Sequence, residues 1–281
     1  MTARIDSAGR PAVAVTGALA SARRVRPLAC VAAVARMVLL TTLRNPPVIV
    51  MGVVQSVVFL LIFRYVFGGA IGVGAMPYVD FMVPGILTVG VLFSVMGVGP
   101  TVAEDLRRGV VDRFRSLPMP AAAVPIGRAL GSHALTTFTL LVTTALAFAV
   151  GFRAREGLSG TLAMLGLCLL TAVAFTWVFV VAGLAVGDPQ AAQGLGFLVL
   201  PLSFVSSAFV PVESMPGWLR VFAQHQPLTV IAEANRYLTQ GAAWSSGAGQ
   251  SGAWYVTAAV LWCLGILGIS VPLALVLFRR R

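Results

Sequence analysis

Residues 48–67 read VIVMGVVQSVVFLLIFRYVF, an apolar run in which only Arg64 carries a charge. The hydrocarbon core of a bilayer is about 30 Å thick, and a helix of about 20 apolar residues crosses it. Because the apolar residues are continuous and do not alternate with polar ones, the strand of a membrane β-barrel is excluded. The run therefore predicts a membrane-spanning helix.

The rest of the chain has the same character. Of its 281 residues 58% are hydrophobic and only 10% are charged, and the mean hydropathy is +0.93. These values lie far outside those of water-soluble domains. We predict an all-α integral membrane protein with six transmembrane helices, at about 48–67, 81–103, 129–151, 161–186, 194–212 and 254–278.

Two N-terminal segments precede these spans. Residues 1–22 are small, polar and weakly patterned, and we predict a disordered cytoplasmic tail. Residues 27–44 are too short for a comfortable span and have Arg36 in their middle. On a helix, Arg26, Arg36 and Arg44 share one side, while apolar residues occupy another. This pattern predicts an amphipathic helix at the membrane interface.

The basic residues predict the orientation of the chain. All 20 are arginines. With six spans both termini lie on the same side, and that side would carry fifteen arginines against five on the other. By the positive-inside rule, the termini are predicted to be cytoplasmic. The arginines flank spans and do not form a basic face with interleaved aromatic residues, so binding to nucleic acid is not predicted.

The chain contains no lysine, and this excludes one kind of site. A Walker A loop needs a lysine to reach the nucleotide's phosphates, so these residues cannot form one. If ATP drives the protein, hydrolysis takes place on a partner. Neither a metal site nor a catalytic group is predicted, because three dispersed cysteines and two unpartnered histidines, His133 and His225, form no known constellation.

Two features leave alternatives open. Arg64, near the end of the first span, can extend its guanidinium to the membrane surface beside Tyr65 or mark a substrate path; the first is the usual role. Between the last two spans, residues 215–223 and 227–237 predict two short amphipathic helices. They can lie on the outer interface or enter the membrane as a re-entrant pair.

The most charged segment, residues 104–118, reads EDLRRGVVDRFRSLP and follows the second span. Its apolar residues recur at helical spacing, and Glu104 stands four residues before Arg108 in the favourable order. We predict a surface helix that ends at Pro118. Its charges either meet water and lipid headgroups, as charge runs usually do, or dock a soluble partner and transmit its motion.

A family resemblance favours the second interpretation. The stretch EDLRRGVVDRFRSLPMPAAAVPIGRALG, residues 104–131, resembles the signature of type-2 ABC export permeases, especially the daunorubicin-resistance group. YVDFMVPGIL (78–87) and FVPVESMPGWLRVFAQHQPLTVIAEANRYL (209–238) are similar to other parts of that family. The matching positions after the second span are Glu104, Asp105, Gly109, Asp112, Arg113, Phe114, Arg115, Ser116, Leu117, Pro118, Gly127 and Arg128.

The resemblance implies a transmembrane domain over residues 23–281 in a bacterial cell membrane. It also implies that this domain pairs with a second permease subunit as a homodimer. ATP and Mg²⁺ would bind a separate ATPase. That ATPase would contact the amphipathic elbow helix and the coupling segment, whose residues are Glu104, Asp105, Arg108, Gly109, Asp112, Arg113, Phe114, Arg115, Leu117 and Pro118.

The predicted function is export of a hydrophobic or amphipathic compound such as an antibiotic, since the spans contain almost no ionisable residues. Two alternatives stay open. An exporter of lipid or polysaccharide precursors would have the same sequence features. An ion-coupled secondary transporter is less favoured, because Asp80, Asp188, Glu213 and Glu233 map to span ends or loops.

Overall fold

The computed structural model describes residues 27–68, 76–109, 123–241, 244 and 250–280. The described residues form helices, turns and loops, with no strand among them. Five helical segments are long and apolar enough to cross a membrane. They are α2 (Pro46–Ile62) with the π-helical turn η2 (Phe63–Phe67), α3 (Tyr78–Met96) with α4 (Val98–Arg107), α6 (Ala123–Ala149), α7 (Gly157–Val186) and α12 (Gly252–Arg280). Five of the six predicted spans are thereby confirmed as membrane-capable helices.

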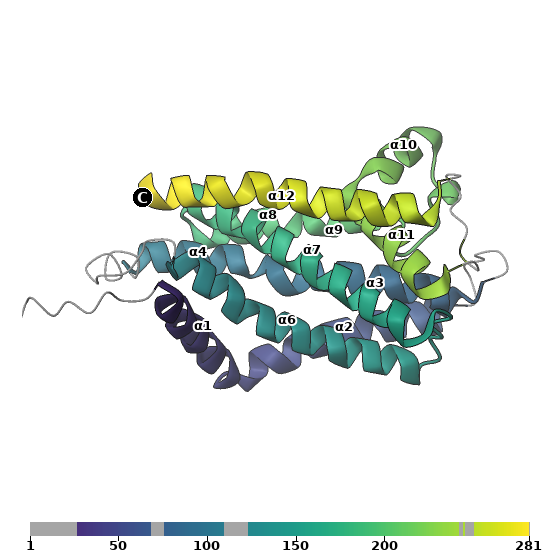
Figure 1. Cartoon of the computed structure of the whole chain (residues 1–281), viewed down its shortest axis with the longest axis horizontal. Helices are drawn as coiled ribbons and strands as arrows, with labels where there is room; N and C mark the ends of the chain where they lie inside the picture. Colours follow the sequence, from purple (N-terminus) through teal and green to yellow (C-terminus); the bar gives the residue numbers. More distant parts are fainter. Residues whose placement is uncertain (1–26, 69–75, 110–122, 242–243, 245–249, 281) are drawn as a thin grey trace, which may run out of the picture.

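The second of these segments is interrupted. α3 ends at Met96 and α4 begins at Val98, with Gly97 between them. Pro100 has no N–H to donate, and its ring crowds the carbonyl group of residue 96, which accounts for the break. α3 and α4 still follow one another along the bundle in Figure 1. Gly97 therefore marks a local break between two successive helices.

The fifth predicted span, 194–212, is wrong as a single helix. The chain forms α8 (Pro189–Phe197) and α9 (Val199–Phe204) and then leaves the helical conformation. α8 starts early because Pro189 occupies its first turn and the Asp188 side chain accepts a hydrogen bond from the N–H of Ala191 (2.9 Å). Pro201 removes a helical hydrogen bond near the junction of α8 and α9.

The two short helices predicted before the last span are present as helices. α10 (Gly217–His225) is largely exposed, and the 3₁₀ turn η3 (Val212–Ser214) precedes it. α11 (Pro227–Gln240) is buried along most of its length and packs on α3, α7 and α12. The sequence left open whether this helix lies on the outer interface or enters the membrane as half of a re-entrant pair; in the structure the helix that contains Arg236 is part of the bundle.

Small residues let the helices approach closely. Gly183 of α7 faces the backbone of Gly99 in α4, where a Cβ would overlap the carbonyl group. α1 (Pro27–Leu43) lies obliquely to the bundle (Figure 1), and its Val34 and Val38 pack into the spaces left by Gly127 and Gly131 of α6. Such glycine contacts are typical of membrane helices, whose association depends on close van der Waals packing.

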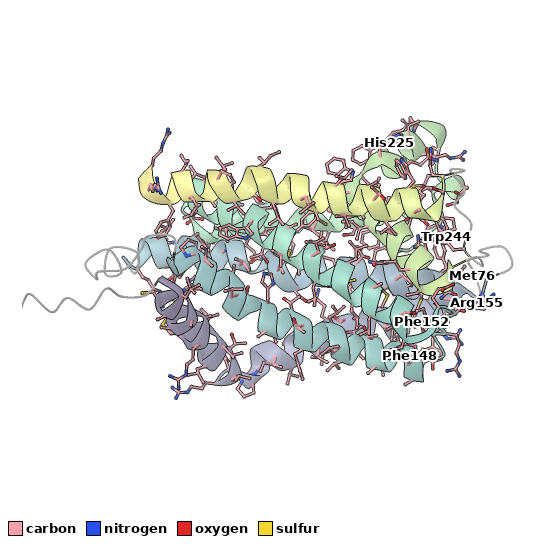
Figure 2. All side chains as sticks on the ribbon, viewed as in Figure 1. Met76, Phe148, Phe152, Arg155, His225 and Trp244 are labelled. Atoms are coloured by element: carbon pink, nitrogen blue, oxygen red, sulfur yellow. The ribbon has the colours of Figure 1, made fainter. Side chains whose placement is uncertain are left out.

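The bundle has two ends, which we name by what they hold. The C-terminal end holds the end of α12, the end of α4 and the starts of α6 and α8 (Figure 1). The α11 end holds α10, α11 and the start of α12. Figure 2 places the labelled residues Met76, Phe152, Arg155 and Trp244 at this second end.

Candidate functional site

The charged segment after the second span begins inside α4. Glu104, Asp105 and Arg107 belong to the last two turns of that helix, and Arg108 is its C-cap. The predicted pair is confirmed, since Arg108 Nε donates to Glu104 Oε1 over 2.6 Å.

The single helix predicted over 104–118 is helical at 104–107, but it does not continue through residues 108–109. α4 ends at Arg107, and Gly109 has φ +63°, a left-handed conformation that glycine adopts without strain. The remaining predicted coupling residues lie outside the described part of the chain. They are Asp112, Arg113, Phe114, Arg115, Leu117 and Pro118.

Two further ion pairs connect the end of α4 to other helices. Asp105 pairs with Arg128 of α6, and each of these side chains is only 17% exposed. Arg107 pairs with Asp188, the N-cap of α8, over 3.4 Å. We call these side chains the α4 ion-pair cluster. The cluster consists of Glu104, Asp105, Arg107, Arg108, Arg128 and Asp188.

The pairs in the cluster differ in strength. Arg107 and Asp188 are 59% and 49% exposed, and exposed pairs contribute about 0–1 kcal/mol. Asp105 and Arg128 are largely withdrawn from water, so removing one partner would leave the other charge poorly solvated. The Asp105–Arg128 pair therefore ties the end of α4 to α6, while α4 itself packs on α7 and α8.

The predicted elbow helix presents its arginines outward. Arg36 and Arg44 are exposed, while Val34 on another side of α1 is buried against α6. Arg26 lies outside the described residues. That α1 is an elbow helix at the membrane interface stays a prediction.

Sequence reasoning missed a second charged site, at the α11 end. Arg236 of α11 has no exposed surface and makes five hydrogen bonds. Its Nε donates to the carbonyl oxygen of Phe81 (2.8 Å). Nη1 donates to Ser207 Oγ (3.0 Å) and to Glu233 Oε1 (2.6 Å). Nη2 donates to the carbonyl oxygens of Ser207 and of Ala208 (3.3 Å for the latter).

Other contacts complete this Arg236 cluster, which consists of Phe81, Ser207, Ala208, Glu233 and Arg236. The guanidinium carbon lies 3.7 Å from the centre of the Phe81 ring, a cation–π contact. The second carboxylate oxygen of Glu233 accepts from the indole N–H of Trp244 over 2.9 Å. The one signal in the sequence was the Glu233–Arg236 spacing of three residues on a helix, which alone does not predict burial.

Arg64 of η2 is half-buried, with its guanidinium carbon 6.0 Å from the centre of the Tyr65 ring. Its Nε is buried without a hydrogen-bond partner in the structure. The three cysteines are free and buried. Within the described residues, no group of three or more His, Cys, Asp or Glu side chains is placed to hold a metal ion.

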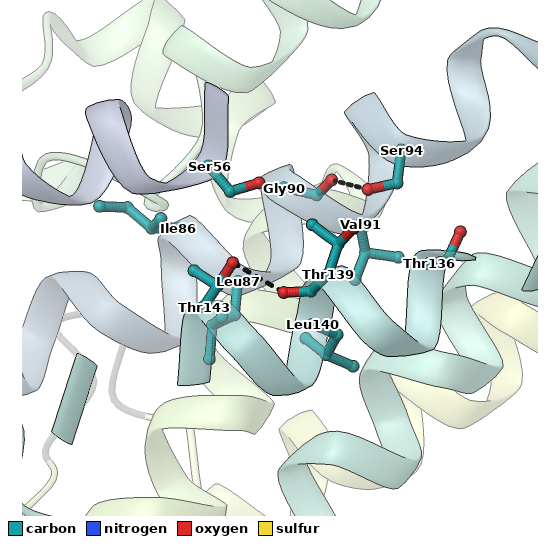
Figure 3. Close-up of a pocket in the computed structure, with 10 residues that line it drawn as sticks. All are labelled: Ser56, Ile86, Leu87, Gly90, Val91, Ser94, Thr136, Thr139, Leu140 and Thr143. Carbon is teal, nitrogen blue, oxygen red and sulfur yellow. Dashed lines mark hydrogen bonds between the residues drawn. The ribbon is translucent and has the colours of Figure 1, made fainter. Parts of the chain in front are cut away.

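A hydroxyl-lined pocket lies between α2, α3 and α6 (Figure 3). Ser94 donates to the carbonyl oxygen of Gly90 (3.0 Å) and Thr143 to that of Thr139 (2.8 Å), both within their own helices. With these donors satisfied, the wall can contact apolar groups at little cost. Its lining residues are Ser56, Ile86, Leu87, Gly90, Val91, Ser94, Thr136, Thr139, Leu140 and Thr143.

Comparison with known proteins identifies the family. The sequence model of the ABC-2 type transporter family matches residues 29–239. The chain is 31% identical over 230 residues to a daunorubicin resistance ABC transporter permease protein of Streptomyces coeruleorubidus, covering 82% of this chain and 78% of the relative. It is 29% identical over 144 residues to a protein named as a probable doxorubicin resistance ABC transporter permease of Mycobacterium tuberculosis, covering 50% and 52% of the two chains.

The family match includes α1, the α4 ion-pair cluster and the Arg236 cluster. Together with five helices capable of crossing a membrane, it identifies a multi-pass membrane protein. The chain belongs to the ABC-2 type transporter family and is a permease of that family.

Proposed function

We propose that this chain is the membrane-spanning subunit of an ATP-driven exporter, and that a separate ABC ATPase docks at the C-terminal end of its bundle. The observation that carries the proposal is the α4 ion-pair cluster, in which one helix end is joined to the starts of two others. A partner that pushes there acts on α4, α6 and α8 at once. Family membership supports an ABC ATPase as that partner.

Orientation follows from the arginines. Arg107, Arg108, Arg279 and Arg280 lie at the C-terminal end of the bundle, which we place in the cytoplasm by the positive-inside rule. The α11 end then faces outward. In this orientation α1 lies at the cytoplasmic interface, where its exposed arginines can contact anionic headgroups or the ATPase.

The cargo we propose is a hydrophobic or amphipathic compound of the antibiotic class. Two relatives are named for resistance to daunorubicin and doxorubicin. The long helices also bury few charges between them, and a strongly charged cargo would need compensating groups along its path. A second permease copy would supply the other wall of that path.

The mechanism begins with ATP-driven closure of the ATPase. The closing subunits push the end of α4, and α4 turns on the break at Gly97 relative to α3. The Asp105–Arg128 pair carries the displacement to α6. Repacking of α3 and α4 against α8 and α9 then opens a path for the cargo to the outside.

Coupling to an ion gradient is the contrasting mechanism. A proton-coupled carrier needs an acid that exchanges its proton with solvent. The buried acids have protein partners instead: Asp80 accepts from the N–H of Arg153 (2.9 Å), and Glu233 is held by Arg236 and by the Trp244 indole. The Glu233 carboxylate therefore has a structural partner on each side.

Drug accumulation in cells tests the proposal. Cells expressing the permease with its ATPase should accumulate less of a fluorescent anthracycline, and should continue to do so after an ionophore collapses the proton gradient. Replacing the Walker A lysine of the ATPase should abolish the effect. Export that survives the lysine replacement but stops with the ionophore would contradict the proposal and favour an ion-coupled carrier.

A further inference from the structure

We propose that Arg236 is a positioning residue for transport: it clamps the start of α3 to residues 205–209, which follow α9, and this contact is a fixed pivot about which the cytoplasmic end of α4 moves. This inference rests on the proposed function and adds a mechanical role for a residue outside the ATPase-coupling segment. It is argued from the polar contacts of residues 205–209 and from the contrast between the two ends of α3–α4.

Residues 205–209 follow α9 and have left the helical conformation. In a membrane, such backbone is tolerated only where its polar groups find partners inside the protein. Here side chains of α11 and α3 provide them. Gln226 donates to the carbonyl oxygen of Val205 (2.9 Å), Thr229 accepts from the N–H of Ser207 (3.1 Å), and Tyr78 donates to the carbonyl oxygen of Phe209 (3.2 Å).

Arg236 is the group that joins the three elements. One guanidinium reaches the backbone of α3 at Phe81 and the carbonyl oxygens of Ser207 and Ala208. In discontinuous helices of ion-coupled carriers, unwound carbonyl groups coordinate a cation. Here the cation is the protein's own side chain. The segment that follows α9 is therefore held to the start of α3 by a buried guanidinium group that donates hydrogen bonds to both.

Packing at the same place leaves no room for sliding. A Cβ on Gly85 of α3 would lie 2.7 Å from the Cα of Ala208, so the two backbones are in direct contact. Glu233 and the Phe81 ring hold the guanidinium from two further directions. Separating α3 from residues 205–209 would leave buried N–H groups of Arg236 without their carbonyl acceptors, which is unfavourable even though the ion pair with Glu233 remains.

The cytoplasmic contact between α4 and α8 is also a packed one, but the ion pair across it is exposed, whereas Arg236 is buried. There α4 and α8 share the Arg107–Asp188 pair, which is long and exposed to solvent. Gly97 also allows α4 to change direction relative to α3, and a Cβ at Gly97 would meet nothing within 4 Å. A force applied at the end of α4 thus opens the cytoplasmic contact first, while the Arg236 cluster stays closed.

Distances between spin labels test the pivot directly. One pair, Met76→Cys with Phe204→Cys, reports on the clamped ends; the other, Thr101→Cys with Gln190→Cys, reports on α4 and α8. The three native cysteines are buried and stay in place. Double electron–electron resonance is recorded on the permease–ATPase complex with and without trapped ATP, and labelled chains are diluted among unlabelled copies so that distances within one chain are read.

We expect ATP to change the Thr101–Gln190 distance and to leave the Met76–Phe204 distance unchanged. In Arg236→Lys, a single ammonium cannot reproduce the guanidinium fork. The Met76–Phe204 distance should then broaden or respond to ATP, and cargo moved per ATP should fall roughly tenfold while ATP turnover continues. Arg155→Lys, an exposed arginine at the same end, is the matched control and should behave as the wild type.

Three results would overturn the pivot. The first is a Met76–Phe204 distance that changes with ATP in the wild-type complex, because the outer contact would then be a gate that opens. The second is normal cargo transport per ATP in a folded Arg236→Lys complex. The third is no response of either pair in a complex that binds ATP; this would contradict the proposed coupling itself, and the pivot with it.

Discussion

Gly85 is the residue at which α3 and the segment after α9 come closest. Its ideal Cβ position overlaps the backbone of Ala208, so any side chain must push the two elements apart. The overlapping partner is main chain, which cannot rotate away as a flexible side chain can. The effect of a substitution at Gly85 therefore reports how tightly the α11 end of the bundle is packed.

Gly85→Ala should lower the stability of the purified permease by about 1–3 kcal/mol, the usual cost of overpacking a close contact. Thermal unfolding in detergent, followed by size-exclusion chromatography, measures the change. Gly166→Ala is the matched control, since its Cβ would meet nothing within 4 Å in the middle of α7. Equal stability of the two variants would contradict the close contact.

The Asp105–Arg128 pair is the corresponding residue-scale contact at the C-terminal end. Asp105→Asn should destabilise the protein by about 2 kcal/mol, because Arg128 keeps its charge in a largely buried position. The exchange Asp105→Arg with Arg128→Asp should recover most of that loss. Arg107→Ala, which breaks an exposed pair, should cost less than about 1 kcal/mol.

The same variants separate packing from coupling. With the ATPase present, Asp105→Asn should weaken cargo-stimulated ATP turnover, and the exchanged pair should restore it if charge pairing between α4 and α6 carries the signal. Restored stability without restored ATP turnover would show that the pair only holds the helices together.

At the scale of whole elements, the interruption of the second crossing matters most. α3 and α4 are separate rods joined at Gly97, and Pro100 removes a helical hydrogen bond that would make them continuous. With such a break, α4 can turn while α3 stays fixed.

Gly97→Ala tests this flexible joint. The added methyl group meets nothing within 4 Å, and alanine favours the helix by up to about 1 kcal/mol, so the fold should be unchanged or more stable. Cargo transport per ATP should nevertheless fall, because the joint is stiffer. Gly265→Ala in α12, which also has open space, is the control. Normal transport by Gly97→Ala would show that α4 and α3 move as one body.

The sequence predicted most elements from the length of apolar runs, which is a local property. Five predicted spans correspond to membrane-capable helices because each run fills the bilayer without help from distant residues. The span predicted at 194–212 failed for the opposite reason. In its second half, backbone and side-chain polar groups bind side chains in and just before α11 and do not form helical hydrogen bonds. These contacts join residues more than twenty positions apart, which a local pattern does not predict.

The candidate sites divide in the same way. The Glu104–Arg108 pair was predictable from its spacing within one helix. The partners of Asp105 and Arg107 come from α6 and α8, so only the fold reveals them. Arg236 was assigned to the outer side by its place between two spans. Its burial depends on α3 and residues 205–209 closing around it, which no local pattern encodes.

For the whole molecule, the first prediction concerns orientation. In intact cells, an impermeant thiol reagent should label Arg155→Cys, which lies exposed at the α11 end, and should label Arg280→Cys only after permeabilisation. The buried native cysteines should give little background. Labelling of Arg280→Cys alone in intact cells would invert the proposed topology.

In the proposed mechanism, a partner's ATP hydrolysis moves this permease through the end of α4. Turnover of ATP by the purified ATPase tests it most directly when measured alone, with the wild-type permease and with the Asp105→Asn permease, all in lipid vesicles with an anthracycline present. We predict that the wild-type permease stimulates ATP hydrolysis and that Asp105→Asn largely removes the stimulation although it still binds the ATPase. An ATPase whose turnover is the same in all three samples would contradict the account.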